Sequence, residues 1–188
     1  MSPLAFMIIA TGTSASESGE RPVSYQQPAV VAAPALARSG TRSTCGIPAF
    51  DQRILEYVNR LRSRGGSCGD HGAFHPARPL GWSERLRVSA DVHAADMATH
   101  SYLSHVGRSD GRTVEQRLAA AGQAWGEYAE NLAAGLTTVE EVITRWANSP
   151  AHCANLLNPN FTELGAACVP AGSTSRFKTY WALDLIGP

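Results

Sequence analysis

The stretch Trp146–Glu163, WANSPAHCANLLNPNFTE, combines a helix start with reactive side chains. Ser149-Pro150 is typical of an N-cap residue followed by proline at the first helical position, so we predict a short helix over residues 151–157. His152 falls in the first turn of that helix, and Glu163 follows shortly after its end. This spacing predicts a polar site at a helix terminus.

Two earlier segments are expected to meet this stretch. SHVGRSDGRT contains His105 and follows a helix, and AENLAAG contains Glu130. Both place a titratable side chain near the end of an expected element. We therefore predict that these segments and the stretch around His152 line one polar cleft.

Sequence patterns that predict helices occur throughout the first two thirds of the expected domain. Apolar residues at helical spacing predict one helix over residues 54–64, ended by Gly65-Gly66. A second helix is predicted from about Ser83, with residues 86–97 supplying its apolar face. Capping boxes at Thr113–Gln116 and Thr138–Glu141 predict two more helices, through residues 121 and 148. His93 and His100 fall in or near the second helix, and we interpret both as structural.

The C-terminal part changes to β-forming residues. Residues 162–169 and 177–186 are separated by a Gly/Ser-rich turn, which predicts an antiparallel hairpin. Helices followed by strands, without β-α-β alternation, predict an α+β domain.

The N-terminal region predicts export. The apolar run in residues 1–15 resembles a signal peptide that lacks basic residues, with Thr13-Ser14-Ala15 as the candidate cleavage site. Residues 16–44 are rich in Ser, Ala and Pro and predict a flexible linker. The domain is expected over residues 45–188. The apolar run is shorter than the roughly 20 residues that span a bilayer, so no transmembrane segment is predicted.

The composition of the chain limits the partners and the cellular compartment that we expect for it. Hydrophobic residues make up 44% of the chain, and 16 basic residues balance 16 acidic ones. The chain lacks the basic patch of a nucleic-acid-binding protein, so no nucleic-acid partner is expected. We expect a monomer. Four cysteines, with no C-x-x-C pair, predict two disulfides in an oxidising compartment, and three pairings remain open.

Four side chains are the candidate site: His105, Glu130, His152 and Glu163. Two imidazoles and a carboxylate could hold zinc or another divalent cation; no other cofactor is indicated. Alternatively, a glutamate could orient a histidine, or the four could satisfy one another's hydrogen bonds. A serine nucleophile at Ser149 is not favoured, because an N-cap hydroxyl is expected to bond the helix backbone.

The ordered segments resemble a known family. SHVGRSDGRT, AENLAAG, W-x-x-S-P-x-H and NFTELG, in this order, are similar to the CAP superfamily of cysteine-rich secretory, antigen five and pathogenesis-related proteins, and most of all to its bacterial SCP-like extracellular branch. The resemblance covers residue 54 to the C-terminus. It implies an αβα sandwich in which a small antiparallel sheet lies between helical layers.

The resemblance also implies a cleft with two His and two Glu, which binds a divalent metal in some members. His105 and Glu130 match two of these positions, whereas the other two fall on Ser149 and Asn160. His152 and Glu163 offer the missing groups from nearby.

The same resemblance implies a Cys68–Cys153 disulfide, which leaves Cys45 to pair with Cys168. From it we expect a secreted protein of the periplasm or cell envelope that binds a lipid, peptide or cell-wall component. The alternative is a metal-dependent hydrolase with His105 and His152 as ligands and Glu130 as general base.

Overall fold

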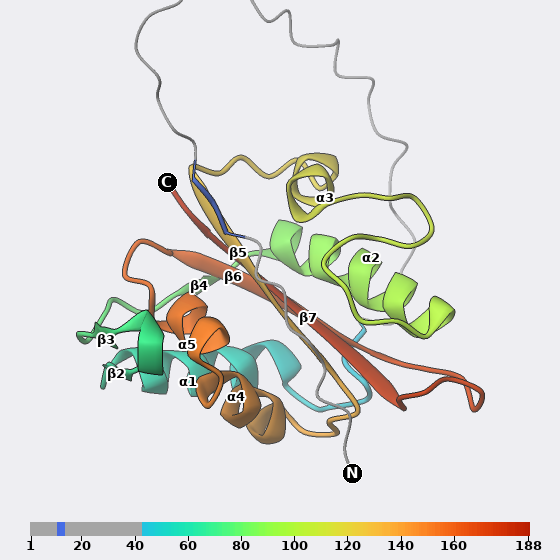
Figure 1. Cartoon of the computed structure of the whole chain (residues 1–188), viewed down its shortest axis with the longest axis horizontal. Coiled ribbons are helices and arrows are strands. Elements are labelled where there is room, and N and C mark those ends of the chain that lie inside the picture. The colour runs from blue at the N-terminus through green and yellow to red at the C-terminus, as the bar shows by residue number, and fades with distance from the viewer. Residues whose placement is uncertain (1–10, 14–42) are drawn as a thin grey trace, which may run out of the picture.

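A computed structural model describes residues 11–13 and 43–188 of the chain. Its main sheet has the strand order β1 (Thr11–Thr13), β5 (Glu127–Ala134), β7 (Thr179–Gly187), β6 (Glu163–Pro170) and β4 (Gly81–Trp82), and helices cover both faces (Figure 1). The signal-peptide and linker predictions lie outside the described residues, apart from three residues in β1 and the last two of the linker.

Helices and strands alternate more than the sequence suggested. The helices are α1 (Phe50–Arg62), the 3-10 turn η1 (Gly69–His71), α2 (Glu84–His100), α3 (Val114–Ala120), α4 (Val139–Ala147) and α5 (Pro150–Leu157). The strands are β1 (Thr11–Thr13), β2 (Gly66–Ser67), β3 (Ala73–Phe74), β4 (Gly81–Trp82), β5 (Glu127–Ala134), β6 (Glu163–Pro170) and β7 (Thr179–Gly187).

The predicted helices and hairpin are confirmed. Both capping boxes form: Thr113 with Gln116, and Thr138 with Glu141. The hairpin is β6–β7, in antiparallel register. β5 also pairs antiparallel with β7, but β4 runs parallel to β6, so the sheet is mixed rather than wholly antiparallel.

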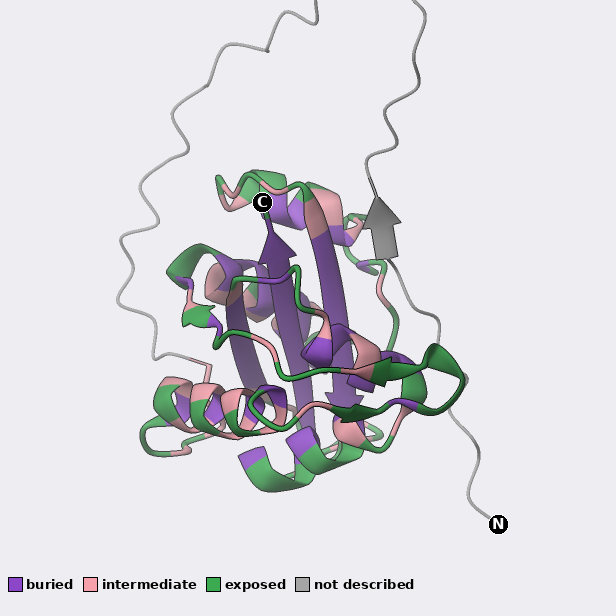
Figure 2. Cartoon of the chain, turned by 90° about the vertical axis from the view of Figure 1, so that its left-hand side faces the viewer, coloured by how far each residue is buried: buried purple, intermediate pink, exposed green. Residues whose placement is uncertain are grey.

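The sheet separates two apolar layers, which makes the predicted αβα sandwich. On one face, α1, α4 and α5 pack on odd-numbered residues of β5 and β7, such as Ala129 and Leu183. On the other, α2 and α3 pack on even-numbered residues such as Leu132 and Ala182. The three long strands are accordingly buried along almost their whole length (Figure 2).

Close packing between α2 and β6 depends on Gly165. A Cβ at this position would lie 2.2 Å from the backbone N of Arg87 and 2.5 Å from the backbone C of Leu86. Since backbone cannot rotate out of the way, Gly165→Ala is expected to destabilise the protein by about 1–3 kcal/mol. Urea unfolding measures this, with Gly172→Ala as the control because its Cβ would meet nothing within 4 Å. Equal midpoints for the two variants would contradict the close α2–β6 contact.

Covalent and polar links fix the stretch around α5. The structure has the disulfides Cys45–Cys168 and Cys68–Cys153, the pairing implied by the family resemblance. The buried guanidinium of Arg62 donates to the carbonyl oxygens of Leu156 (2.9 Å) and Asn158 (2.8 Å). Charge-assisted bonds of this kind hold the C-terminal end of α5 on α1.

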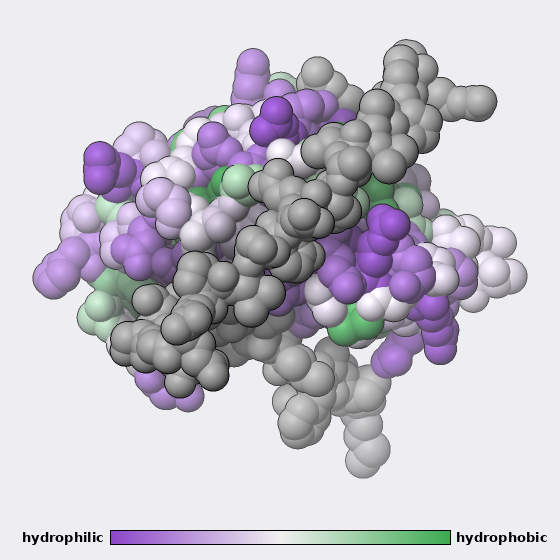
Figure 3. All heavy atoms as spheres, turned by 90° about the horizontal axis from the view of Figure 1, so that it is seen from above, coloured by the Kyte–Doolittle hydropathy of each residue, from purple (hydrophilic) through white to green (hydrophobic). Residues whose placement is uncertain are grey.

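The described surface is mostly polar. One face shows hydrophilic residues with apolar ones in small separate patches (Figure 3). Among the described residues, the large hydrophobic side chains that stay exposed are Val92, Leu103 and Val106. None of the helices described is both long and apolar enough to cross a bilayer.

Candidate functional site

Glu130 is the centre of a buried polar cluster between the sheet and α2. It lies in the middle of β5, has no exposed surface, and accepts a hydrogen bond from Nδ1 of His105 at 2.7 Å. Its second oxygen accepts a charge-assisted bond from the guanidinium of Arg117. Both carboxylate oxygens therefore have partners.

Arg117 links the cluster to the loop that carries His105. It projects from α3 and also donates to the carbonyl oxygens of His105 (3.1 Å) and Arg112 (3.0 Å). The capping box at Thr113 sets the start of α3, and thereby the direction in which Arg117 points. The guanidinium of Arg117 thus holds both the backbone of His105 and the carboxylate of Glu130 in place.

Hydrogen bonds keep Glu130 ionised despite its burial. Burial alone would raise the pKa of Glu130, but the bond from His105 and the positive charge of Arg117 outweigh it. The pKa of Glu130 is therefore held below its usual value. A carboxylate in this state orients the imidazole and is a weak proton acceptor.

His93 belongs to the same cluster, although we interpreted it as structural. Its Nε2 lies 2.7 Å from the carbonyl oxygen of Ser104 and 4.0 Å from Glu130. Burial lowers the pKa of His93 and favours the neutral ring. Its place one helix turn from Ala90 and Met97, on the buried face of α2, was the signal that could have indicated this contact.

Asp184 is a member of the cluster that sequence analysis missed. It lies on β7 directly opposite Glu130, is fully buried, and has no hydrogen bond of ordinary geometry to either oxygen within the described chain. Burial and the negative charge of Glu130 raise the pKa of Asp184 to about 8. The carboxyl group is therefore mostly protonated at neutral pH.

His152 approaches β5 from the other face. Its carbonyl oxygen accepts a bond from Asn131 (3.2 Å), whose own amide oxygen accepts from Asn155 (2.9 Å). Since Asn131 follows Glu130 in the strand, their side chains point to opposite faces of the sheet. The two imidazoles of the predicted site therefore lie on either side of β5.

The two rings still interact through their charges. Burial, and then the positive charge of His105, lower the pKa of His152 to about 4. We expect the ring protons of His152 to titrate near pH 4 in an NMR experiment. A midpoint above pH 6 would show that the ring is not in this buried environment.

Glu163 is not brought to Glu130. It begins β6, and β7 lies between β6 and β5. Within the described chain, no hydrogen bond or ion pair joins its side chain to the cluster. The structure therefore assembles His105 with Glu130, places His152 across the strand, and leaves Glu163 two strands away.

The donor set as arranged does not fit a zinc site. Glu130 has both oxygens engaged by His105 and Arg117. In the part of the chain that the structure describes, no three His, Cys, Asp or Glu side chains converge to hold a metal ion. Ser149 occupies the N-cap position of α5, but its hydroxyl does not form the capping bond that we expected.

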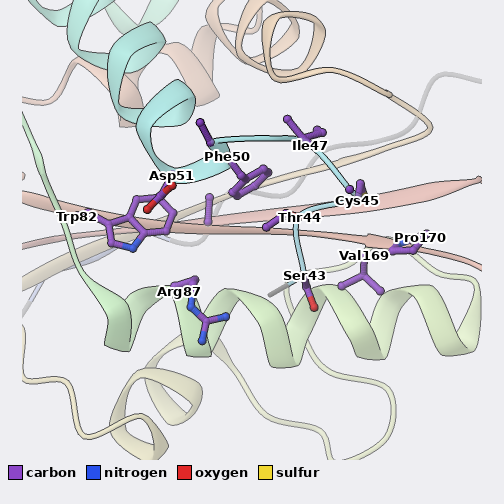
Figure 4. Close-up of a pocket in the computed structure, with 13 residues that line it drawn as sticks. Ser43, Thr44, Cys45, Ile47, Phe50, Asp51, Trp82, Arg87, Val169 and Pro170 are labelled. Carbon is purple, nitrogen blue, oxygen red and sulfur yellow. The ribbon is translucent and has the colours of Figure 1, made fainter. Parts of the chain in front are cut away.

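A separate pocket of about 900 Å³ lies at the opposite edge of the sheet. Phe50, Trp82 and Val169 form apolar walls, and Arg87 lies at its α2 side (Figure 4). Two strands, β7 and β6, separate this pocket from β5. No residue of the predicted site lines it.

Comparison with known proteins gives the family. The model of the cysteine-rich secretory protein family, CAP, matches residues 55–185. The protein YkwD of Bacillus subtilis is 30% identical over 158 residues, which are 82% of this chain and 55% of YkwD. The membrane protein YlbC of the same organism is 26% identical over 131 residues, which are 70% of this chain and 35% of YlbC. The chain thus spans about half, or less, of these curated relatives.

Solved structures agree. An extracellular protein with an SCP domain from Bacillus anthracis superposes with a TM-score of 0.60 at 28% identity, covering 73% of this chain and 40% of that one. An outer surface protein of Borrelia burgdorferi gives 0.56 at 19% identity, covering 72% and 87%, and supports the fold alone. The matched residues, the αβα layers and the two disulfides show that the chain belongs to the cysteine-rich secretory protein family.

Proposed function

We propose that this protein is an extracytoplasmic ligand-binding module whose site lies around His105, at the outer edge of β5. The ligand classes we consider are a lipid, a peptide or a cell-wall component. Two disulfides are typical of proteins from an oxidising compartment, and the similar Bacillus anthracis protein is described as extracellular.

The proposal rests on the imidazole of His105, which is partly exposed while the side chains that hold it in place are buried. The side chain of His105 is 13% exposed, whereas those of Glu130 and Arg117 are 0% and 2% exposed. Nδ1 of His105 is fixed by Glu130, and Nε2 is not engaged by any described residue. A polar group held this rigidly, with part of its surface open to solvent, is suited to recognise a ligand.

Exposed apolar side chains on the loop that carries His105 support binding. Leu103 and Val106 flank His105 in sequence and are 40% and 47% exposed. Burial of such side chains by a ligand would contribute roughly 25 cal/mol for each Å² removed from water. The loop that carries His105 thus offers one positioned imidazole and two exposed apolar side chains.

The geometry favours binding over metal-dependent hydrolysis. A general base must reach the proton that it removes, and Glu130 is fully buried with both oxygens bonded. Its lowered pKa further weakens it as a base. Its contacts support a positioning role toward His105.

A binding assay with three ligand classes tests the proposal. Purified protein is mixed with phosphatidylglycerol vesicles, peptidoglycan sacculi or a pool of random decapeptides. We expect retention by at least one class, and at least ten-fold weaker retention for His105→Gln. His75→Gln, at an exposed loop position, is the matched control and should bind as the unsubstituted protein does. Retention by no class, or equal retention by His105→Gln, would overturn the proposal.

A further inference from the structure

We propose that the pocket at the β6 edge of the sheet binds a short, uncharged oligosaccharide, with a sugar ring stacked on the indole of Trp82. The pocket has a volume of about 900 Å³ and lies between the starts of α1 and α2 (Figure 4). That volume is within the range of about 300–1,000 Å³ that small-molecule sites occupy. His105 and its partners Glu130 and Arg117 are not among the described residues that line it, so this inference goes beyond the proposed function and does not depend on it.

One wall of the pocket is fixed to the sheet by covalent and backbone bonds. The disulfide Cys45–Cys168 joins the chain just before α1 to β6. The N–H of Cys45 donates to the carbonyl oxygen of Cys168 at 3.0 Å, and the N–H of Cys168 donates to that of Ser43 at 2.8 Å. Phe50, which also lines the pocket, stacks on Trp181 with ring centroids 5.8 Å apart. A wall held in this way is formed before binding, so little conformational entropy is lost when a ligand enters.

Trp82 supplies a flat apolar surface on another side of the pocket (Figure 4). Its backbone is held in place, because the N–H groups of its neighbours Gly81 and Ser83 donate to carbonyl oxygens at 2.9 and 2.8 Å. The indole packs against the core yet is only partly buried. Trp82 therefore presents a positioned aromatic ring, part of whose surface is open to solvent.

A sugar ring has the chemistry that such a surface recognises. One face of a pyranose carries C–H groups, which are attracted to the negative face of an aromatic ring, and its hydroxyl groups lie around the edge. The polar side chains that line the pocket are those of Ser43, Thr44, Asp51 and Arg87. Aromatic and aliphatic walls next to hydrogen-bonding groups match both parts of a saccharide.

The charges around the pocket favour an uncharged ligand over an anionic one. Arg87, the basic residue among the described lining residues, is paired with Glu84 at 2.7 Å and lies 3.6 Å from Asp91. Asp51 adds a further negative charge to the lining. A fatty acid or a phosphate would therefore bring its anion close to carboxylates. A sterol or an alkyl chain would displace water from the polar lining without replacing its hydrogen bonds.

A titration of the full chain with triacetylchitotriose, an uncharged trimer of N-acetylglucosamine, tests the inference. We expect Trp82→Ala to bind the probe at least about ten-fold more weakly than the unsubstituted protein, because the stacking surface is lost. Trp82→Phe keeps an aromatic face and should bind within about three-fold of the unsubstituted protein. Trp125→Ala is the matched control, because Trp125 is also half-buried but packs on Tyr128, away from the pocket.

NMR of the unsubstituted protein gives a second measurement that does not depend on the folding of a variant. On titration with the probe, the indole N–H resonance of Trp82 should move, whereas that of Trp125 should stay in place. A fixed Trp82 resonance, or equal losses of affinity in Trp82→Ala and Trp82→Phe, would overturn the inference. Binding of laurate in place of the probe would also overturn it, because the pocket would then take a lipid.

A failure of this pocket can be told apart from a failure of the proposed site. His105→Gln should bind the probe as the unsubstituted protein does. If sacculi are retained by His105→Gln but not by Trp82→Ala, the pocket is supported and the proposed site at His105 is wrong. If His105→Gln abolishes retention while the probe leaves the Trp82 resonance unmoved, only the pocket is wrong.

Discussion

Replacing Arg117 with Met is expected to destabilise the protein by about 3–5 kcal/mol, because it leaves the carboxylate of Glu130 buried without its cation. The guanidinium is almost fully buried and also bonds two loop carbonyls, so no water or neighbouring side chain can replace it readily. The loop that carries His105 should loosen as well, since Arg117 holds its backbone. Urea unfolding at pH 7 measures the loss.

A double-mutant cycle shows whether the ion pair is responsible. Glu130→Gln removes the charge that Arg117 neutralises, so the Arg117→Met/Glu130→Gln protein should be more stable than Arg117→Met alone. If the double variant loses the sum of the two single losses, the coupling between these side chains is absent and the cluster around Glu130 is wrong.

The second large effect concerns Asp184 and appears as a dependence of stability on pH. The folded state holds the pKa of Asp184 at about 8, against an ordinary value of 3.8. Between these two values the folded protein keeps a proton that the unfolded chain has released. The contribution of Asp184 to the free energy of unfolding therefore falls as pH rises from about 4 to 8, by up to roughly 1.4 kcal/mol per pH unit.

Asp184→Asn isolates this effect. The amide resembles the protonated acid in shape and cannot ionise, so the variant should gain stability over the unsubstituted protein as pH rises toward 8. The lowered pKa of His152 acts in the opposite direction between about pH 4 and 6.5, but it is common to both proteins and cancels in the difference. Thermal unfolding from pH 4 to 9 measures that difference. A constant difference across this range would contradict a protonated Asp184.

Local signals were enough to predict most helices and the hairpin. The capping boxes at Thr113 and Thr138 each satisfy backbone groups within a few residues, so their effect can be read without knowing the fold. The β6–β7 hairpin likewise joins neighbours in sequence. β5 was missed as a strand because it pairs with β7, about fifty residues later, and because buried residues on both of its faces remove the alternation that marks a strand.

The site was predicted only in part, because some of its residues meet only through contacts between segments far apart in the sequence. His105 and Glu130 could be proposed from their positions in motifs, and the structure joins them. Arg117 and Asp184 carry no local signal: Arg117 is one residue of a short amphipathic helix, and Asp184 is one acid in an apolar strand. Their roles follow from the register that sets Asp184 opposite Glu130 and from the way α3 packs beside α2.

We expect the two imidazoles of the predicted site to interact across β5, because the positive charge of His105 is one cause of the lowered pKa of His152. NMR titration of the His152 ring in His105→Gln tests this directly. We expect the pKa of His152 to rise from about 4, because the charge of His105 contributes to its depression. His75→Gln should leave it unchanged. An identical His152 titration in the unsubstituted protein and in His105→Gln would contradict this interaction between the two rings.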